Sequence, residues 1–524
     1  MRWVKVLQLA LATALATAFA GQAGAENVLR WASAGGVLTW DPHGSTTETP
    51  SLVGFRQVYE SLVTIDADLI PRPALAVAWH LIDPTSWRFE LRRGVSFHDG
   101  TSFSAEDVVF SIERARSEGS DLAAYTSSIA AVQAVDDATV EVTTRHPDML
   151  LPVNLRQVAI LSKAWAERHG IATARPYAQG APPLNRANGT GPFMLDSHET
   201  GRRTVLVRNP RWWGLAESPH NLDRIVWDIV PDPKERLALL LNGQTDFVQD
   251  PPLEALGSIR TRPGFKLAEA GELRVLLLGF NQGTGALHSG ELEGANPFKD
   301  KRVRRALYHA IDIEAMREDV MAGLAIPTGI TIPPGVNGYA PELDQRLAYD
   351  PARAKALLAA AGYSEGFGVT LDCPNNRYVN DEAICRAVAA QLGRIGVRVT
   401  VDAQPKEVHF AKLFERRTDF YLLGYLTASF DSALHFRELY HGRAGRWGAT
   451  GYANPTLDAL IERIDAELVT YGRDALIEEA WRIILDDVVV IPLHRQMIVW
   501  AMRDGLDLPV SPLNSPTFSR ARLN

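Results

Sequence analysis

The sequence predicts an α/β fold with more than one domain. Strand-like and helix-like segments alternate along the chain instead of gathering in separate blocks, which is typical of α/β proteins. The chain has 524 residues, far more than one hydrophobic core usually organises. Residues 368–425 also show the β-α-β pattern that builds parallel sheets. Together these observations predict an α/β protein of two or more domains.

Residues 1–25 are predicted to be a secretory signal peptide. Arg2 and Lys5 precede an apolar run from Val6 to Phe19, and small residues follow at 23–25. A membrane-spanning helix needs about 20 apolar residues, and this run is shorter. No Cys lies near the cleavage point, so we expect no lipid attachment. The mature protein is therefore expected to be soluble and periplasmic.

The charge balance argues against nucleic acid as a partner. The chain has 54 basic and 62 acidic residues, a net charge of −8, which becomes −10 when the two basic residues of the signal peptide are removed. Charges of both signs are well mixed, so a patch for a membrane surface or a polyanion is not indicated.

A strand, a tight turn and a helix are predicted in direct succession within residues 87–113. Apolar and charged residues alternate at the start, so one face of a strand is apolar. Asp99 and Gly100 then form a turn. Ser104 is a natural N-cap, and Asp107 is placed to complete a capping box.

Two strands and a helix between them form the clearest parallel unit. Val369–Cys373 reads as a strand, Asp381–Ile395 as a helix that Gly396 ends, and Val397–Val401 as the next strand. A further strand, Phe420–Gly424, follows another helix. The repeated order predicts a parallel sheet.

The two cysteines, Cys373 and Cys385, lie in this unit. In an oxidising compartment they are expected to form a structural disulfide, and two buried thiols are the alternative. A metal or redox motif would need C-x-x-C or nearby His, and neither is present.

Several ordered motifs resemble landmarks of the extracytoplasmic solute-binding proteins of peptide-type ABC importers. This group, family 5, includes dipeptide, oligopeptide and nickel binders. The motif RxGVxFHDGxxFxAEDVVFS within residues 92–111 carries the resemblance first, and further landmarks follow in the family's order. They are Leu38–His43, Gln57–Leu62, Gly189–Phe193, Arg208–Pro210 with Trp212-Trp213, Phe280-Asn281, and Lys301–Ala306 with Ala310–Asp312.

The resemblance implies a two-lobed periplasmic binding protein fold, type II and cluster C-like, with a subdomain inserted in lobe I. It implies the following boundaries: lobe I at 26–50, 185–268 and 485–524, the inserted subdomain at 51–184, and lobe II at 269–484. Two chain crossings would form a hinge, which lets ligand contacts from both lobes shift an open-closed equilibrium.

A search for catalytic motifs argues against an enzyme. The sequence has no G-x-S-x-G elbow, no H-E-x-x-H, no phosphate-binding G-x-x-x-x-G-K and no dinucleotide-binding G-x-G-x-x-G. The 13 His are scattered singly, each better explained as a surface or core residue than as a metal ligand. We expect no catalytic residue, no metal site and no cofactor.

Polar residues that follow strands of lobe II are the first candidates for ligand binding. Ligands of open α/β sheets bind outside the carboxyl ends of strands. Arg377 and Tyr378 follow the strand that ends at Cys373, and the planar guanidinium of Arg377 suits a carboxylate. The alternative is an arginine on a solvated loop. The resemblance implies an arginine for the ligand carboxylate in this lobe.

The segment Gly424–Ala428 resembles the family's Gly-Trp-x-x-Asp segment, whose Asp pairs with the amino terminus of a peptide. Ala428 stands at the Asp position, and a buried ammonium without a counter-charge would cost several kcal/mol. Asp431 is the nearest substitute. Its alternative role is to cap the helix that follows.

Aromatic and polar residues near family landmarks complete the predicted site. Tyr425, Trp447, Trp40 and Asn281 are chosen by position, because aromatic rings there could stack on a ligand. Any of these tryptophans could instead belong to a core.

We expect a monomeric periplasmic receptor that captures a di- or oligopeptide, or a similar small polar solute, and delivers it to an ABC permease in the inner membrane. One alternative is a non-peptide ligand, such as a metal chelate, an opine or an oligosaccharide, which the missing Asp at position 428 favours. A secreted hydrolase is the alternative from another class.

Overall fold

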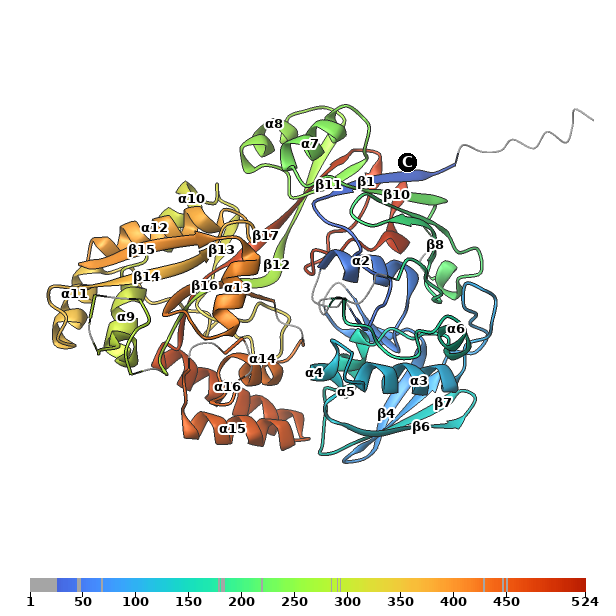
Figure 1. Ribbon diagram of the computed structural model, residues 1–524, viewed down its shortest axis with the longest axis horizontal. Helices are drawn as coiled ribbons and strands as arrows, with labels where there is room; N and C mark the ends of the chain where they lie inside the picture. The colour runs from blue at the N-terminus through green and yellow to red at the C-terminus, as the bar shows by residue number, and fades with distance from the viewer. Residues whose placement is uncertain are drawn as a thin grey trace, which may run out of the picture.

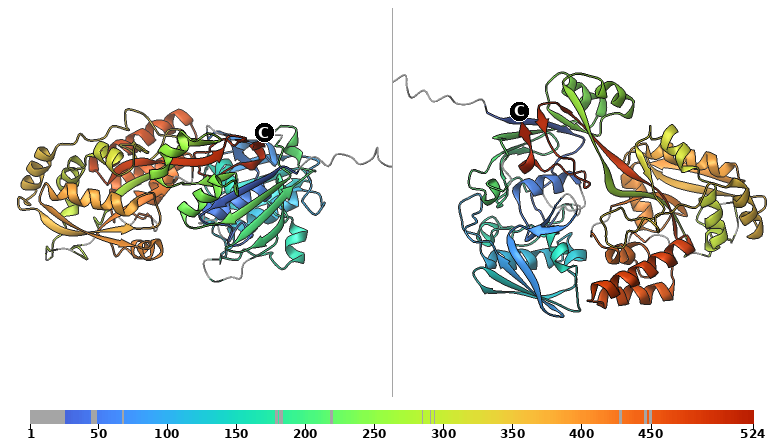
Figure 2. Two further views of the ribbon diagram at one scale, coloured as in Figure 1. Left: turned by 90° about the horizontal axis from the view of Figure 1, so that it is seen from above. Right: turned by 180° about the vertical axis from the view of Figure 1, so that it is seen from behind.

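The computed structural model has two lobes that lie side by side and are joined at one end (Figures 1 and 2). It describes residues 26–44, 49–66, 69–177, 180, 184–217, 220–283, 285–289, 291–292, 294–426, 429–444, 447–448 and 451–524. The predicted signal peptide and Ala428 therefore lie outside the described residues. None of the helices within these ranges is long and apolar enough to cross a membrane.

One large mixed sheet runs through both lobes in the order β15-β14-β16-β12-β17-β11-β1-β10-β9-β8, with β13 (Ala325–Pro327) paired to β17. Lobe II contributes the first three strands, which are β15 (Val397–Gln404), β14 (Phe367–Pro374) and β16 (Phe420–Leu426). Lobe I contributes the last five, which are β11 (Phe247–Gln249), β1 (Val28–Ser33), β10 (Arg224–Ile229), β9 (Arg203–Arg208) and β8 (Phe193–Glu199).

Two long antiparallel strands, β12 (Phe265–Phe280) and β17 (Val490–Arg503), connect the lobes (Figure 1). The first part of β12 pairs with the end of β17 next to β11, and the second part pairs with β16. Their register is interrupted between Gly271 and Val275. This short irregular stretch lies where both strands cross from one lobe to the other, which is where a hinge would bend.

A separate antiparallel sheet lies within the segment predicted as the inserted subdomain. Its order is β4-β5-β7-β6, and the strands span Ala76–Asp83, Ser86–Leu91, Thr139–Thr144 and Ile129–Asp136. The predicted strand, turn and helix are confirmed here as β5, a turn with Gly100 at φ 91°, and α3 (Ala105–Arg116). The predicted capping box is also present, because Asp107 accepts a 3.0 Å hydrogen bond from the Ser104 amide.

A buried ion pair ties α3 to the loop after β1. The guanidinium of Arg114 donates to both oxygens of Asp41 at 2.9 and 2.7 Å, and both side chains are at most 2% exposed. Arg114 also donates to the carbonyls of Ile171 and Thr173. Next to this pair, the Nε2 of His43 lies 2.9 Å from the Ala159 carbonyl oxygen. We call this group the Arg114 junction.

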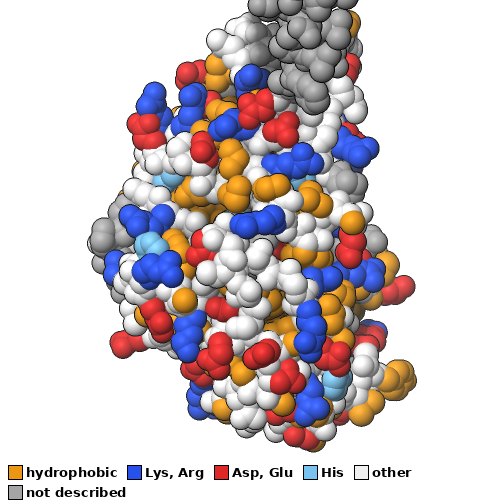
Figure 3. All heavy atoms as spheres, turned by 90° about the vertical axis from the view of Figure 1, so that its right-hand side faces the viewer, with side chains coloured by type: hydrophobic (Ala, Val, Ile, Leu, Met, Phe, Trp, Pro, Cys, Tyr) orange, Lys and Arg blue, Asp and Glu red, His pale blue; other side chains and the backbone are white. Residues whose placement is uncertain are grey.

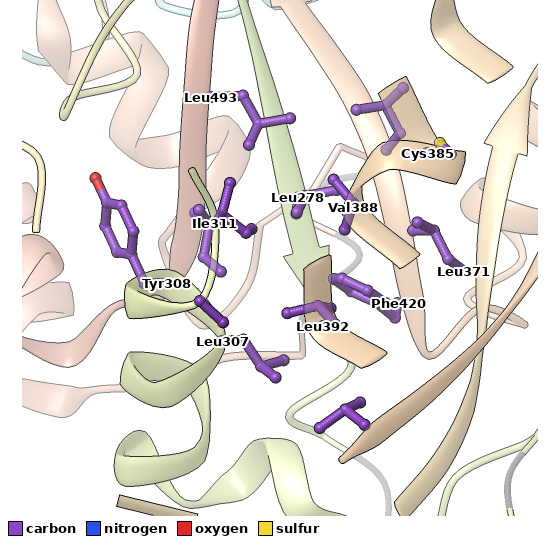
Figure 4. Packing of buried hydrophobic residues seen from close by; sticks show 14 of the residues in the cluster. Leu278, Leu307, Tyr308, Ile311, Leu371, Cys385, Val388, Leu392, Phe420 and Leu493 are labelled. Carbon is purple, nitrogen blue, oxygen red and sulfur yellow. The ribbon is translucent and has the colours of Figure 1, made fainter. Parts of the chain in front are cut away.

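The parallel unit predicted in lobe II is confirmed. Strand β14 pairs in parallel with both β15 and β16, and α12 (Asp381–Gly393) connects β14 to β15. Figure 4 shows Val388 and Leu392 of α12 packed with Leu278 of β12 and Phe420 of β16. A disulfide joins Cys373 to Cys385, and it closes the loop between β14 and α12.

The remaining elements cover the sheets or connect them. In lobe I and its insertion they are α2 (Thr49–Val58), β2 (Val63–Ile65), β3 (Pro71–Pro73), α4 (Ala123–Thr126), α5 (Leu151–Asn154), α6 (Lys163–Arg168), α7 (Pro233–Leu241) and α8 (Leu256–Arg260). In lobe II they are α9 (Lys301–His309), α10 (Ile313–Asp319), α11 (Pro351–Ala360), α13 (Lys406–Phe414), α14 (Ser432–Leu439), α15 (Pro455–Ala466) and α16 (Thr470–Asp487). A last pair, β18 (Leu506–Asp507) and β19 (Arg522–Leu523), lies near the C-terminus.

The outer face of lobe I carries charges of both signs. Figure 3 shows lysines and arginines interspersed with aspartates and glutamates over this side of the molecule. The view agrees with the mixed charge pattern of the sequence, which gave no indication of a polyanion-binding patch.

Candidate functional site

The two lobes touch through a small apolar cluster beside the hinge. Leu69 of lobe I, Leu273 of β12 and Phe430 of lobe II are each less than 9% exposed and pack together. The guanidinium of Arg156 lies over the ring of Phe430, 4.9 Å from its centroid. Groups from both lobes therefore meet at this point, and Leu150 of lobe I also packs against the core of lobe II.

A cavity of about 450 Å³ lies in lobe I next to this contact. Its walls come from α2, from the chain between residues 60 and 74, from Trp212 and Trp213, and from residues 509–520. Leu69 and Arg156 line it and also belong to the contact with Phe430, so the cavity reaches the place where the lobes meet. Its volume is in the range of small-molecule binding sites.

Four arginines line this cavity. Arg72 pairs with Asp66 at 2.7 Å and Arg520 is exposed, which leaves Arg56 and Arg156, from two different elements. Arg56 is in the last turn of α2, and Arg156 is in a short 3-10 helix, Leu155–Gln157, that follows α5. Both side chains are half-buried. Leu155 and Phe55, their neighbours in the chain, are almost fully buried in the cores of this lobe, which fixes the backbone that carries each arginine.

Three acidic residues, Glu60, Asp66 and Glu217, also line the cavity, but none of the described carboxylates forms an ion pair with Arg56 or Arg156. Glu60 accepts from Thr190, Trp212 and Trp213, and Asp66 pairs with Arg72. Burial lowers the pKa of Arg56 to about 10. Burial, and then the nearby charge of Arg56, lower the pKa of Arg156 to about 9. The Nε of Arg156 is buried and donates to no acceptor. Both groups remain cations at neutral pH, so the cavity edge carries two positive charges that repel each other.

Lobe II faces this edge with Tyr425 and Glu438. The Tyr425 hydroxyl donates to a carboxylate oxygen of Glu438, and its ring lies edge-on to Trp447 at 6.2 Å. Across the lobe contact, burial and then the charge of Glu438 raise the pKa of Tyr125 to about 12. The charges of Arg156 and Arg56 lower the pKa of Tyr125, but burial and Glu438 outweigh them, so the hydroxyl stays protonated at neutral pH.

A second group of predicted residues lies around Gly424. The hydroxyl of Tyr378 donates to the Gly424 carbonyl at 3.2 Å, and its ring is so close that a Cβ on Gly424 would lie 2.5 Å from it. Arg377 lies over the Tyr378 ring at 5.4 Å, and Arg274 lies at 5.8 Å. Because Gly424 precedes Tyr425, the fold brings Arg377, Tyr378, Tyr425 and Trp447 to one end of β14 and β16.

Comparison with known proteins identifies the family. The sequence profile of the "Bacterial extracellular solute-binding proteins, family 5 Middle" matches residues 71–447, which is most of the chain. The protein belongs to family 5. Its members are the substrate-binding components of ABC transporters.

Two relatives in sequence and one solved structure describe the similarity of this family 5 protein. Heme-binding protein A of Haemophilus influenzae is 32% identical over 337 residues, which are 60% of this chain and 58% of that protein. Glutathione-binding protein GsiB of Salmonella choleraesuis is 28% identical over 409 residues, 77% of this chain and 73% of GsiB. In structure, the periplasmic binding protein DppA of Helicobacter pylori in complex with the peptide STSA matches with a TM-score of 0.78 and 23% identity, over 95% of this chain and 98% of DppA.

Asp431 is the N-cap of α14 in this family 5 protein. One of its oxygens accepts from the amide of Ala433 at 2.8 Å. Both oxygens also accept from the guanidinium of Arg473, and Asn337 donates to one of them at 2.9 Å. All of these side chains come from lobe II. The helix-capping role that the sequence offered as the alternative is therefore present, and the carboxylate is already fully engaged.

The last two predicted residues, Trp40 and Asn281, lie apart from this group. Trp40 is 0% exposed and packs edge-on against Phe55 in the lobe I core. Asn281 follows β12, which runs antiparallel to β16, so it lies at the opposite end of β16 from Tyr425. Its amide donates to Asp419 at 3.2 Å. The fold therefore does not bring Trp40 or Asn281 to the lobe contact.

Sequence reasoning missed Arg56, Arg156, Tyr125 and Glu438. One signal was available, because Arg156 is a lone cation within the largely apolar stretch 149–161. A charged residue inside such a stretch either finds a partner in the fold or serves a function. For Arg56, in contrast, only the folded chain can show whether an acidic side chain lies close enough to pair with it.

Proposed function

We propose that this protein is the periplasmic receptor of an ABC importer, capturing a di- or oligopeptide or a similar small polar solute and delivering it to the permease. The observation that carries the proposal is the cavity beside the lobe contact, whose edge holds two cations without acidic partners. Such a grouping of aromatic walls and a few polar anchors suits the binding of a small polar molecule.

Lobe closure is the proposed mechanism. Among the described strands, β12 and β17 alone carry the sheet from one lobe to the other, and their register is interrupted between Gly271 and Val275. The apolar contact between the lobes is small, so the free-energy difference between open and closed forms should be modest. A ligand that touches both lobes would then shift the population towards the closed form.

The proposed ligand contacts come from both lobes. Lobe I contributes Arg56 and Arg156, and lobe II contributes Tyr425 and Trp447 with Arg377 and Tyr378 nearby. We also propose the predicted domain boundaries, the signal peptide at residues 1–25 and a monomeric state. The apolar run after Lys5 supports export, and the separate sheet β4-β5-β7-β6 supports a subdomain within residues 51–184.

A non-peptide ligand is the second candidate. The absence of the family's Asp at Ala428 favours it, because a peptide amine would need another counter-charge. Among the described residues no group of three or more His, Cys, Asp or Glu is placed to hold a bare metal ion. A metal chelate bound through its organic part, an opine or an oligosaccharide remains compatible with the same cavity.

Native mass spectrometry of gently purified protein, followed by thermal-shift screening, tests the proposal. The screen contains di- to pentapeptides, glutathione, opines, metal-histidine chelates and oligosaccharides. A ligand at 100 times its dissociation constant adds about 2.7 kcal/mol to the free energy of unfolding, which is a readily measured shift. Stabilisation by peptides supports the peptide assignment, and stabilisation by a non-peptide solute alone replaces it. Hydrolysis of ester or peptide substrates without any ligand-induced stabilisation would contradict the receptor function.

A further inference from the structure

Arg56 and Arg156 differ from the well-buried arginines of this protein. The guanidinium of Arg114 binds Asp41 and two carbonyls. Arg304 donates to the carbonyls of Val488 and Phe298 at 2.9 and 2.6 Å. Each of these arginines is thus held by acceptors of the fold itself, which is the usual state of a buried guanidinium.

The two cavity arginines have no such acceptors among the described residues. Among the described residues of lobe II, the ring of Phe430 contacts Arg156, and a cation–π contact compensates a charge only partly. Tyr125 stays protonated and brings no charge of its own. Two cations that repel each other beside a cavity are unfavourable for the fold, so their presence there calls for an anion from outside.

We propose that Arg56 and Arg156 form the anion-binding end of the ligand site and select solutes that carry a free carboxylate. This inference rests on the proposed receptor function and narrows its ligand class. A carboxylate matches the planar fork of a guanidinium with two parallel hydrogen bonds. Two adjacent guanidiniums can share one carboxylate or hold two, so peptides with a free C-terminus and small dicarboxylic or tricarboxylic acids fit best.

The position of the pair also links anion binding to closure. Arg56 and Arg156 belong to lobe I, whereas Phe430, which covers Arg156, belongs to lobe II. An anion bound at the pair removes the repulsion between the arginines and keeps the guanidinium of Arg156 in place under Phe430. The closed form is therefore expected to bind the anion more tightly than the open form.

Isothermal titration calorimetry on the full mature protein tests the inference. Each free acid that binds in the thermal-shift screen is compared with its C-terminal amide, and succinate and citrate are titrated as simple probes. Free acids are expected to bind at least 10-fold more tightly than their amides. Equal affinity for acids and amides, or a tightest ligand without any carboxylate, would overturn the selection for anions.

Substitution of each arginine separates binding from folding. The Arg56→Gln and Arg156→Gln variants are expected to weaken free-acid binding by roughly 10- to 100-fold each while leaving the affinity for amides nearly unchanged. Arg156→Lys keeps the charge but loses the fork, so its affinity should fall between those of wild type and Arg156→Gln. The control is Arg202→Gln, an exposed arginine that pairs with Glu199.

The outcomes distinguish the inference from the function on which it rests. If neutral or cationic solutes bind tightly and Arg156→Gln does not affect them, the receptor function stands and the anion site is wrong. If no solute of any charge binds to the wild-type protein, the receptor function fails and the inference falls with it. If free acids bind to the wild-type protein but not to either Gln variant, the receptor function and the anion site are both supported.

Discussion

The Arg114 junction and the cavity edge place arginines in the same half of the molecule in opposite surroundings. At the junction, Arg114 has a buried carboxylate partner with two hydrogen bonds and further backbone acceptors. At the cavity edge, Arg56 and Arg156 face each other's charge, and Arg156 Nε donates to nothing. The difference separates a cation that is paired within the fold from cations that we propose bind a ligand.

The largest expected effect is at the Arg114 junction. Asp41→Asn leaves the buried Arg114 without its counter-charge, so we expect the free energy of unfolding to fall by about 3–5 kcal/mol in urea denaturation. The double variant Asp41→Asn with Arg114→Met removes both charges and should recover part of this loss. A single variant within about 1 kcal/mol of wild type would mean that the pair does not stabilise the fold.

The second-largest expected effect on stability is at the disulfide between Cys373 and Cys385. Cys373 and Cys385 are separated by 12 residues and close the loop that carries Arg377 and Tyr378. Replacing both with Ser should lower the free energy of unfolding by about 3 kcal/mol, because the unfolded chain gains freedom. Urea titrations of the variant and of the oxidised wild type provide the measurement, and wild type under reducing agent is the control. An unchanged unfolding midpoint would contradict this role.

Acid should weaken the Arg114 junction through His43. Burial, and then the charge of Arg114, lower the pKa of His43 from 6.5 to about 3. The neutral His43 ring contributes in full to the free energy of unfolding above pH 6.5. This contribution is lost as the pH falls towards 3. Between pH 7 and 5 the loss is about 2 kcal/mol. Denaturation of wild type and His43→Gln at both pH values checks this, and an equal pH dependence of the two proteins would argue against it.

The smallest expected effect on stability is at the cavity edge. In the ligand-free protein, Arg156→Gln removes the repulsion from Arg56 and loses the contact with Phe430, so the two changes oppose each other. The free energy of unfolding should stay within about 1 kcal/mol of wild type. A loss as large as that of Asp41→Asn would assign Arg156 to the fold and remove the contrast between the two regions.

Local sequence signals predicted the elements that depend on neighbouring residues. The strand, turn and capped helix of residues 87–113 form as expected, because alternation, Asp99-Gly100 and the Ser104–Asp107 box all act within a few positions. The β-α-β order of residues 367–404 was equally local and predicted the parallel pairing of β14 with β15. The ordered family landmarks added the two-lobed fold.

Charge pairing across the fold could not be predicted in the same way. The place of Asp431 in the chain suggests a ligand anchor, but its partners in the fold, Asn337 and Arg473, are 94 and 42 positions away. Arg56 and Arg156 are 100 positions apart, and nothing local shows that they meet. Whether a charged side chain has a partner depends on tertiary contacts, and this decides between a structural role and ligand binding.

A crystal structure of the complex with the tightest-binding free acid tests the central claim most directly. The ligand is expected in the cavity beside the lobe contact, with carboxylate oxygens about 2.7–3.2 Å from guanidinium nitrogens of Arg56 and Arg156. A ligand bound elsewhere, or one that turns its ammonium or a neutral group towards these two arginines, would contradict it.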